Sequence, residues 1–96
     1  MASKYTRAAR GQPCLVRIPS ICNHNPETTV FAHLNGGGMG AKHRDIFGAF
    51  ACSDCHQWLD SGYVQEDTAR WARDAMHYEG MVRTQNWLIE HGILIL

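Results

Sequence analysis

Cys52-Ser53-Asp54-Cys55-His56 is the stretch that decides the fold of this 96-residue chain. It places two thiols two residues apart, and an imidazole follows the second. Such a spacer lets both thiols of one turn face the same ion, and an earlier pair, Cys14 and Cys22, can complete a four-thiolate site. The sequence therefore predicts a structural Zn²⁺ bound by all four cysteines. The alternatives are four free or disulfide-bonded thiols, or a zinc site in which His56 or His33 replaces one cysteine.

The length of the chain predicts one small domain spanning residues 1–96, because so few residues cannot build two cores. A metal staple would help a domain of this size. No run approaches the roughly 18 uncharged apolar residues of a membrane span, and the first residues lack the apolar core of a signal peptide. We therefore expect a cytoplasmic protein without a membrane partner. In the reducing cytosol, cysteines serve as metal ligands more readily than they form disulfides.

Charge is divided unevenly along the chain, although the formal net charge is zero. Residues 1–44 carry six Lys or Arg against Glu27 alone, whereas residues 45–96 carry eight Asp or Glu against three Arg. A basic half can attract phosphate despite overall neutrality. The alternative is that both halves are simply solvated surfaces, and charge alone does not separate the two.

The pattern along the chain predicts an α+β fold in three parts. Residues 1–13 form a basic arm, residues 14–62 form the zinc-stapled unit, and residues 63–96 form C-terminal helices. Within the unit, β-branched and aromatic residues predict strands over 14–18, 28–34 and 46–51. A short helix should start at Ser53 or Asp54, either of which could cap it, and end at Gly62. A longer helical segment follows over 66–90, which Gly80 could kink or divide.

His56, Asp60 and His33 are the candidate catalytic groups. Asp60 lies four residues after His56, so both side chains share one helix face and could bind a catalytic Mg²⁺ or Mn²⁺. His33 ends a predicted strand, and a neutral imidazole can take a proton from water. A strand histidine, a helix histidine and a nearby cation suffice for phosphodiester hydrolysis. Each residue also has a structural alternative. His33 could be a hydrogen-bonded core residue, His56 could donate a hydrogen bond to the zinc thiolates, and Asp60 could be a solvated helix residue. The other histidines are expected at the surface: His24, His43, His77 and His91.

The motifs resemble a known family when they are taken in order. Ala9-Arg10-Gly11, Arg17-Ile18-Pro19, Ala32-His33 and Ala51-Cys52 to His56 are similar to the small predicted nucleases of lambdoid prophages, and to HNH or His-Me finger nucleases in general. The resemblance covers most of the chain. It implies a ββα-metal hairpin and helix stapled by four cysteines.

The resemblance also implies roles for individual residues. His33 matches the general base, and His56 matches the metal-ligating histidine at the start of the helix. Asp45 lies where HNH proteins place the Asn that braces the loop, so it would hold the backbone of His33. Ala32 is a departure, because many HNH nucleases carry an Asp or His ligand at that position.

Three functions compete on this sequence. We favour a metal-dependent endonuclease acting on DNA. The Ala32 departure favours instead a non-catalytic zinc-stapled module that binds nucleic acid or a phage or host recombination or replication protein. A structural interaction protein is the third, in which Trp71, Tyr78 and Trp87 form a dimer seam, although these aromatics are more simply the core under the ββα unit.

Overall fold

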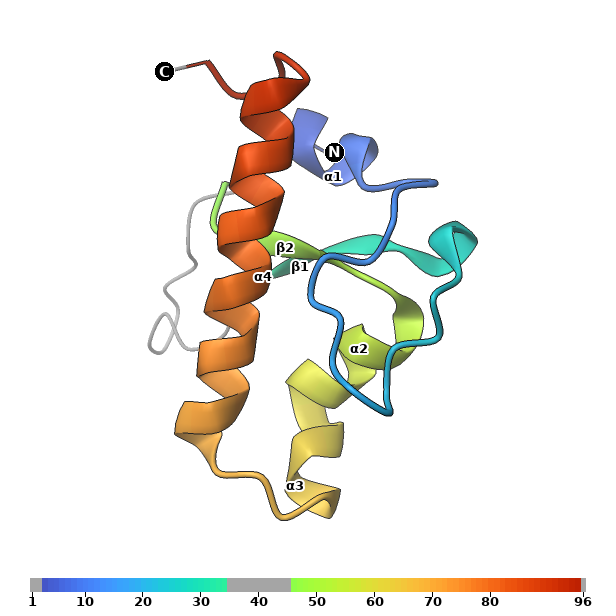
Figure 1. Ribbon diagram of the computed structural model, residues 1–96, viewed down its shortest axis with the longest axis vertical. Coiled ribbons are helices and arrows are strands. Elements are labelled where there is room, and N and C mark those ends of the chain that lie inside the picture. The colour runs from blue at the N-terminus through green and yellow to red at the C-terminus, as the bar shows by residue number, and fades with distance from the viewer. Residues whose placement is uncertain (1–2, 35–45, 96) are drawn as a thin grey trace.

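The computed structural model describes residues 3–34 and 46–95, which form a small α+β structure with one two-stranded sheet. The elements are listed here in chain order: α1 (Lys4–Ala8), the 3-10 turn η1 (Pro26–Thr28), β1 (Val30–His33), β2 (Gly48–Ala51), α2 (Ser53–Gln57), the π-helical turn η2 (Trp58–Gly62), α3 (Tyr63–Gln65) and α4 (Arg70–Glu90). The long helix α4 lies across the hairpin, and α2 and α3 follow from the far end of β2 (Figure 1).

The hairpin pairs β1 and β2 antiparallel, with Val30 opposite Ala51 and His33 opposite Gly48. The outer edge of β2 is bonded as well. The carbonyl of Phe50 accepts N–H bonds from Leu15 at 2.8 Å and from Val16 at 3.2 Å. The N–H of Phe50 donates to Thr84 Oγ1 on α4 at 2.9 Å. The hairpin is therefore held on its open edge by side chains and turns rather than by a third strand.

The predicted strand over 14–18 is wrong, since the structure has no strand there. Its two ladder-like bonds both go to one carbonyl. Arg17 has φ 55° and Ser20 has φ 67°, which lie in the left-handed region and end any extended run. The segment turns back instead, and this turn carries Cys14 toward Cys22.

The helix after Cys52 starts at Ser53 as predicted, but its cap and its end differ from the prediction. The predicted caps Ser53 and Asp54 are wrong, because Cys52 is the N-cap and its Sγ accepts the N–H of Cys55 at 3.4 Å. Gly62 does not end the helix either. Its backbone is helical, with φ −61° and ψ −26°, and the chain continues through α3 to Gln65. Asp67, with φ 54°, then turns the chain into α4.

Helix α4 runs for 21 residues without a break, so the predicted kink at Gly80 is wrong. Gly80 is present because the helix approaches its neighbours closely there. A Cβ at this position would lie 2.8 Å from Val16 Cγ2 and 3.2 Å from Ala49 Cβ. Three of the five buried residues of the helix are polar or charged, namely Arg73, His77 and Thr84, and the other two are Gly80 and Leu88.

The apolar interior has two parts that meet at the hairpin. One surrounds the cysteines and includes Ala32, Ala49, Trp58 and Leu59. The other lies under α1 and the end of α4 and includes Phe31, Phe50 and Leu88. Within residues 3–34 and 46–95, no helix has both the length and the apolar character that crossing a bilayer requires.

Candidate metal and catalytic sites

The four cysteines come together at one point although they are spread over 42 positions of the sequence. The Sγ atoms of Cys14, Cys22, Cys52 and Cys55 all lie within 4.8 Å of one another, and that of Cys52 is 3.9 Å from that of Cys22. Four sulfurs at a Zn–S distance of about 2.3 Å from one ion lie about 3.8 Å apart. The cluster can therefore hold a tetrahedral metal ion with only small movements of the thiols.

Backbone N–H groups already point at two of these sulfurs. The N–H of Arg17 donates to Cys14 Sγ at 3.5 Å, as that of Cys55 does to Cys52 Sγ. Hydrogen bonding from the Cys55 thiol lowers the pKa of Cys14 to about 4. Burial, with the nearby Cys14 charge, raises the pKa of Cys22 to about 11. A cation bound by the cluster would displace the protons of its ligand thiols.

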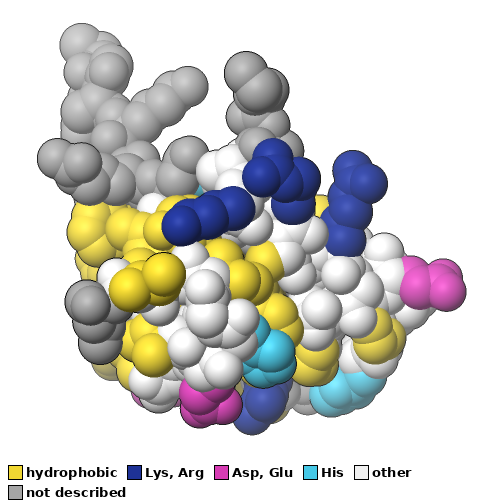
Figure 2. All heavy atoms as spheres, turned by 90° about the horizontal axis from the view of Figure 1, so that it is seen from above, with side chains coloured by type: hydrophobic (Ala, Val, Ile, Leu, Met, Phe, Trp, Pro, Cys, Tyr) yellow, Lys and Arg dark blue, Asp and Glu magenta, His cyan; other side chains and the backbone are white. Residues whose placement is uncertain are grey.

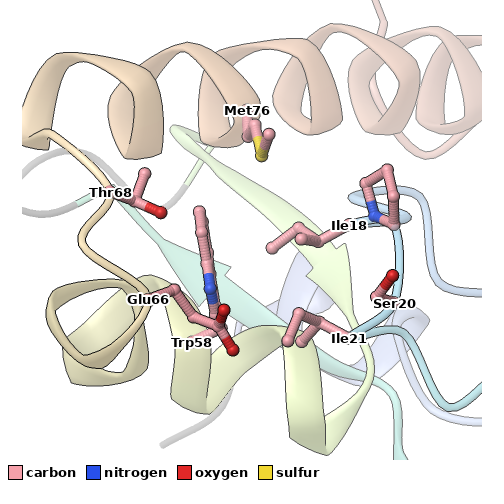
Figure 3. A pocket seen from close by; sticks show the side chains of 8 residues that line it. Ile18, Ser20, Ile21, Trp58, Glu66, Thr68 and Met76 are labelled. Atoms are coloured by element: carbon pink, nitrogen blue, oxygen red, sulfur yellow. The ribbon is translucent and has the colours of Figure 1, made fainter.

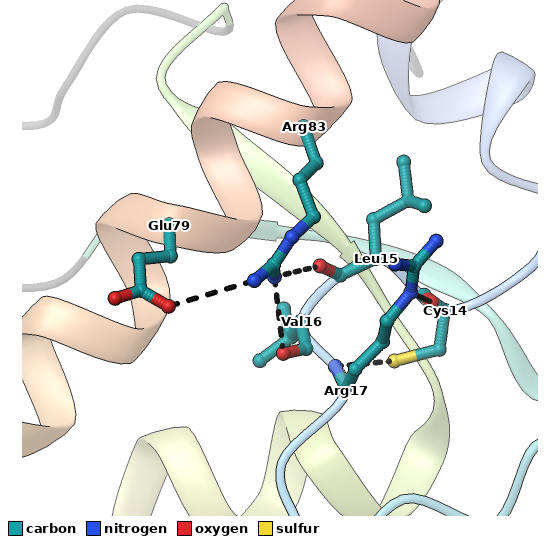
Figure 4. A network of polar contacts seen from close by, with 6 residues as sticks. All are labelled: Cys14, Leu15, Val16, Arg17, Glu79 and Arg83. Atoms are coloured by element: carbon teal, nitrogen blue, oxygen red, sulfur yellow. Dashed lines mark hydrogen bonds and ion pairs between the residues drawn. The ribbon is translucent and has the colours of Figure 1, made fainter.

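The loop that carries Cys14 is fastened to α4 through Arg83 (Figure 4). Arg83 Nη1 donates to the carbonyl of Leu15 at 2.7 Å, and the guanidinium also pairs with Glu79 at 3.5 Å. Arg17 Nε donates to the carbonyl of Cys14 at 3.3 Å. These bonds fix the first cysteine of the cluster from two sides, which makes the ligand set preorganised.

His56 directly follows the last cysteine of the cluster in sequence, but its side chain pairs with Asp60. Its Nε2 is 3.5 Å from Asp60 Oδ2, one helical turn away, and the two side chains are 42% and 54% exposed. Cis ligands on an octahedral Mg²⁺ lie about 3 Å apart, so this pair suits two positions on such an ion. The imidazole that does approach the cluster is His24, whose Nδ1 is 3.7 Å from Cys22 Sγ.

His33 is exposed at the last position of β1. Its ring meets the edge of Phe31, two residues earlier on the same strand face, with 5.1 Å between centroids. Gly48, opposite His33, is required by this arrangement, because a Cβ there would overlap the ring of Phe31. The strand end thus presents an imidazole to solvent on an aromatic support. Asp45, the predicted brace, lies outside the described residues, as does His43.

His77 is wrongly predicted as a surface residue, since it is 2% exposed. Its Nε2–H donates to the carbonyl of Ala32, directly before His33, at 2.9 Å. Burial lowers the pKa of His77, and its hydrogen bond to the carbonyl of Ala32 acts on it in the opposite direction. In the sequence, His77 lies four residues after Arg73 and three before Gly80, so these three residues share one helix face. This spacing is the signal that could have placed His77 on the buried face.

Positive side chains gather near α1, on the face that Figure 2 shows from above. Lys4, Arg7 and Arg10 are exposed there, and Arg17 is exposed on the next loop. Tyr5 of α1 stacks on Phe31 with 6.4 Å between centroids. The basic helix therefore lies against the strand that ends at His33.

A separate hollow of about 340 Å³ lies between the loop at 18–21, Trp58 and Met76 (Figure 3). Its described lining is mainly apolar, with Glu66 and Thr68 at one side. Neither His33 nor His56 lines it. The candidate catalytic groups are consequently on the open surface rather than in this hollow.

Comparisons with known proteins agree with one another. A family model described as "Putative nuclease YbcO" matches residues 3–93. Relatives of that name from Escherichia coli (strain K12) and Enterobacteria phage 82 are each 39% identical over 98 residues, covering 92% of this chain and 93% of the relative. A solved structure, described as a putative bacteriophage protein from Escherichia coli str. K-12 substr. MG1655, has a TM-score of 0.75 and 38% identity, covering 91% of this chain and 98% of that one. The chain therefore belongs to the family described as Putative nuclease YbcO.

Proposed function

We propose that this protein is a metal-dependent endonuclease that hydrolyses phosphodiester bonds in DNA, with residues 1–96 acting as one HNH-like domain. The family name and the relatives' names support a nuclease. The observation that carries the proposal is the solvent-accessible His56–Asp60 pair, which begins on the helix that follows the hairpin, together with the exposed His33 at the end of the first hairpin strand. The resemblance to HNH nucleases, which implies a ββα-metal hairpin and helix with His33 and His56 in these roles, supports the proposal.

His33 is the proposed general base. An exposed imidazole on a strand end can reach a water molecule that approaches a bound phosphodiester, and Phe31 limits how far the ring can turn. The hydrogen bond from His77 to the carbonyl of Ala32 holds the backbone directly before it. Asp45 stays a prediction as the brace of the loop that follows.

His56 and Asp60 are the proposed ligands of a catalytic Mg²⁺ or Mn²⁺, which would stabilise negative charge on the phosphate and on the leaving oxygen. Two protein ligands are few, but Mg²⁺ commonly keeps several waters and binds through one or two carboxylates plus substrate phosphate. The exposure of both side chains leaves room for these partners.

The cysteine cluster is proposed as a structural Zn²⁺ site. A closed set of four sulfurs leaves no open position for substrate, which is typical of structural zinc. The cluster joins the 14–22 loop to the first turn of α2. It would therefore set the position of His56, which directly follows the last ligand.

DNA is the proposed substrate because α1, which exposes Lys4 and Arg7, packs through Tyr5 on the strand that carries His33. Exposed Lys and Arg contribute sequence-independent affinity through phosphate contacts. A non-catalytic module that binds nucleic acid or a phage or host recombination protein is the second candidate. The observation that favours it is Ala32, which is 1% exposed and offers no ligand atom beside the base.

A plasmid nicking assay with a panel of divalent ions separates these candidates. We expect nicking by the wild-type protein, and loss of nicking in His33→Ala with the metal content unchanged. His91→Ala is the matched control, because His91 is also exposed but lies at the end of α4, stacked on Trp87. Salt-sensitive DNA binding without cleavage in any ion would select the non-catalytic module. Equal nicking by His33→Ala and wild type would reject the proposed base.

A further inference from the structure

Helix α4 carries a second apolar row on its solvent side. Trp71, Tyr78 and Val82 are 76%, 51% and 56% exposed, and Ala75 and Ile89 are exposed as well. The prediction that Trp71 and Tyr78 lie in the core is therefore wrong. At about 100° per residue, the row lies roughly 150° around the helix from the buried residues His77 and Thr84. Among residues 3–34 and 46–95, the packing of α4 on the hairpin uses the opposite side of the helix, where His77 and Thr84 bond to the strands.

The spacing of this row is that of a helix–helix seam. Trp71, Ala75, Tyr78 and Val82 follow at intervals of four, three and four, and Ile89 is seven residues further on. Alternating intervals of three and four place side chains along the line that faces a partner helix in two-helix packing. A scattered surface residue needs no explanation, but a continuous row with a largely exposed Trp marks an interaction site.

We propose that a second copy of this chain covers the row, so that two α4 helices pack against each other about a two-fold axis. Nucleic acid is a poor occupant, because the exposed charges beside the row are predominantly acidic: Glu79 and Glu90 on α4, and Glu66 and Asp67 before it, against Arg70 at the start of α4. A copy of this chain has zero formal net charge. Glu79, the acid next to Tyr78, is already paired with Arg83 at 3.5 Å, which limits repulsion across the seam.

The exposed area fits a weak dimer. Aromatic side chains bury about 150–250 Å² each, so the exposed parts of the row amount to roughly 400 Å² of apolar surface per copy. With a polar rim, two copies would bury on the order of 1,000 Å², the lower limit for a specific interface. The dissociation constant is accordingly expected on the order of 10 µM.

Sedimentation of the full chain over a range of about 1 µM to 500 µM tests this proposal. Val82→Asp places a charge in the middle of the row and should weaken association by at least about tenfold, one step of roughly 1.4 kcal/mol. Val64→Asp is the matched control, because Val64 is 62% exposed on α3, outside the row. Trp71→Ser is a second variant in case Val82→Asp does not fold.

Tryptophan emission gives an independent signal. Trp58 is buried and Trp87 is half-buried between Phe50 and His91, so a concentration-dependent blue shift that Trp71→Phe removes would come from the seam. The proposal requires dimers in wild type and Val64→Asp, and monomers in Val82→Asp or Trp71→Ser. A wild-type monomer throughout the range would overturn it, as would equal association of the row variants and the control. A blue shift of Trp71 emission on adding duplex DNA to the monomer would assign the row to nucleic acid and would also overturn it.

Discussion

Replacing Gly80 by alanine should destabilise the protein, whereas the same replacement at Gly62 should not. Both glycines are buried and both have helical backbone. Alanine in a helix interior is favoured over glycine by about 1 kcal/mol. The difference between the two sites therefore comes from what the added methyl group would meet.

At Gly80 the methyl would lie 2.8 Å from Val16 Cγ2, 3.1 Å from Val16 Cα and 3.2 Å from Ala49 Cβ. The last two atoms cannot turn away, so α4 or the 14–16 segment must shift. Overpacking of this kind costs about 1–3 kcal/mol, which exceeds the gain in helix propensity. At Gly62 the nearest atoms are 3.6 Å away, an ordinary contact, so the propensity gain remains.

Thermal and urea unfolding of the metal-loaded protein measure this difference. We expect Gly80→Ala to lower the free energy of unfolding by up to about 2 kcal/mol, the overpacking cost less the propensity gain, which is up to roughly 15 °C in Tm for a chain of this size. Gly62→Ala should be as stable as wild type or up to about 1 kcal/mol more stable. If Gly80→Ala proved as stable as Gly62→Ala, the close packing of α4 on Val16 and Ala49 would be refuted.

Two further predictions concern the metal and a buried histidine. Cys52→Ser, or removal of the metal by a strong chelator, should abolish native near-UV circular dichroism, because a structural zinc contributes about 10 kcal/mol or more to folding; a native spectrum in the metal-free protein would count against this role. The pKa of His77 is lowered by burial from its ordinary 6.5, so the unfolded state binds the proton more readily. Its contribution to the free energy of unfolding is therefore complete above pH 6.5 and declines as the pH falls below it. Urea unfolding should show this decline in wild type and a smaller one in His77→Gln, and identical pH profiles would contradict it.

The hairpin, the following helix and the convergence of the cysteines could be predicted from the sequence because each depends on local chemistry. The β-branched run before His33 favours a strand, and two thiols separated by two residues favour a shared ion. The pairing of Val30 with Ala51 joins these segments in the expected order. The metal cluster needed no information from the rest of the chain.

The errors concern positions that the tertiary structure decides. The 14–18 segment has a strand-like composition but bonds only to Phe50, because Arg17 and Ser20 turn it away. Gly80 looks like a helix breaker in sequence, yet it is a contact point for α4. The apolar residues of α4 predicted the wrong buried face. The face that packs on the hairpin contains His77 and Thr84, whereas Trp71 faces solvent.

The division of the Cys52–His56 stretch between two metal sites is the central claim, and anomalous diffraction from crystals soaked in Mn²⁺ tests it most directly. We predict a zinc signal among Cys14, Cys22, Cys52 and Cys55, and a separate manganese signal at His56 and Asp60. A single peak that includes His56 among the zinc ligands, or manganese bound away from His56 and Asp60, would contradict the account.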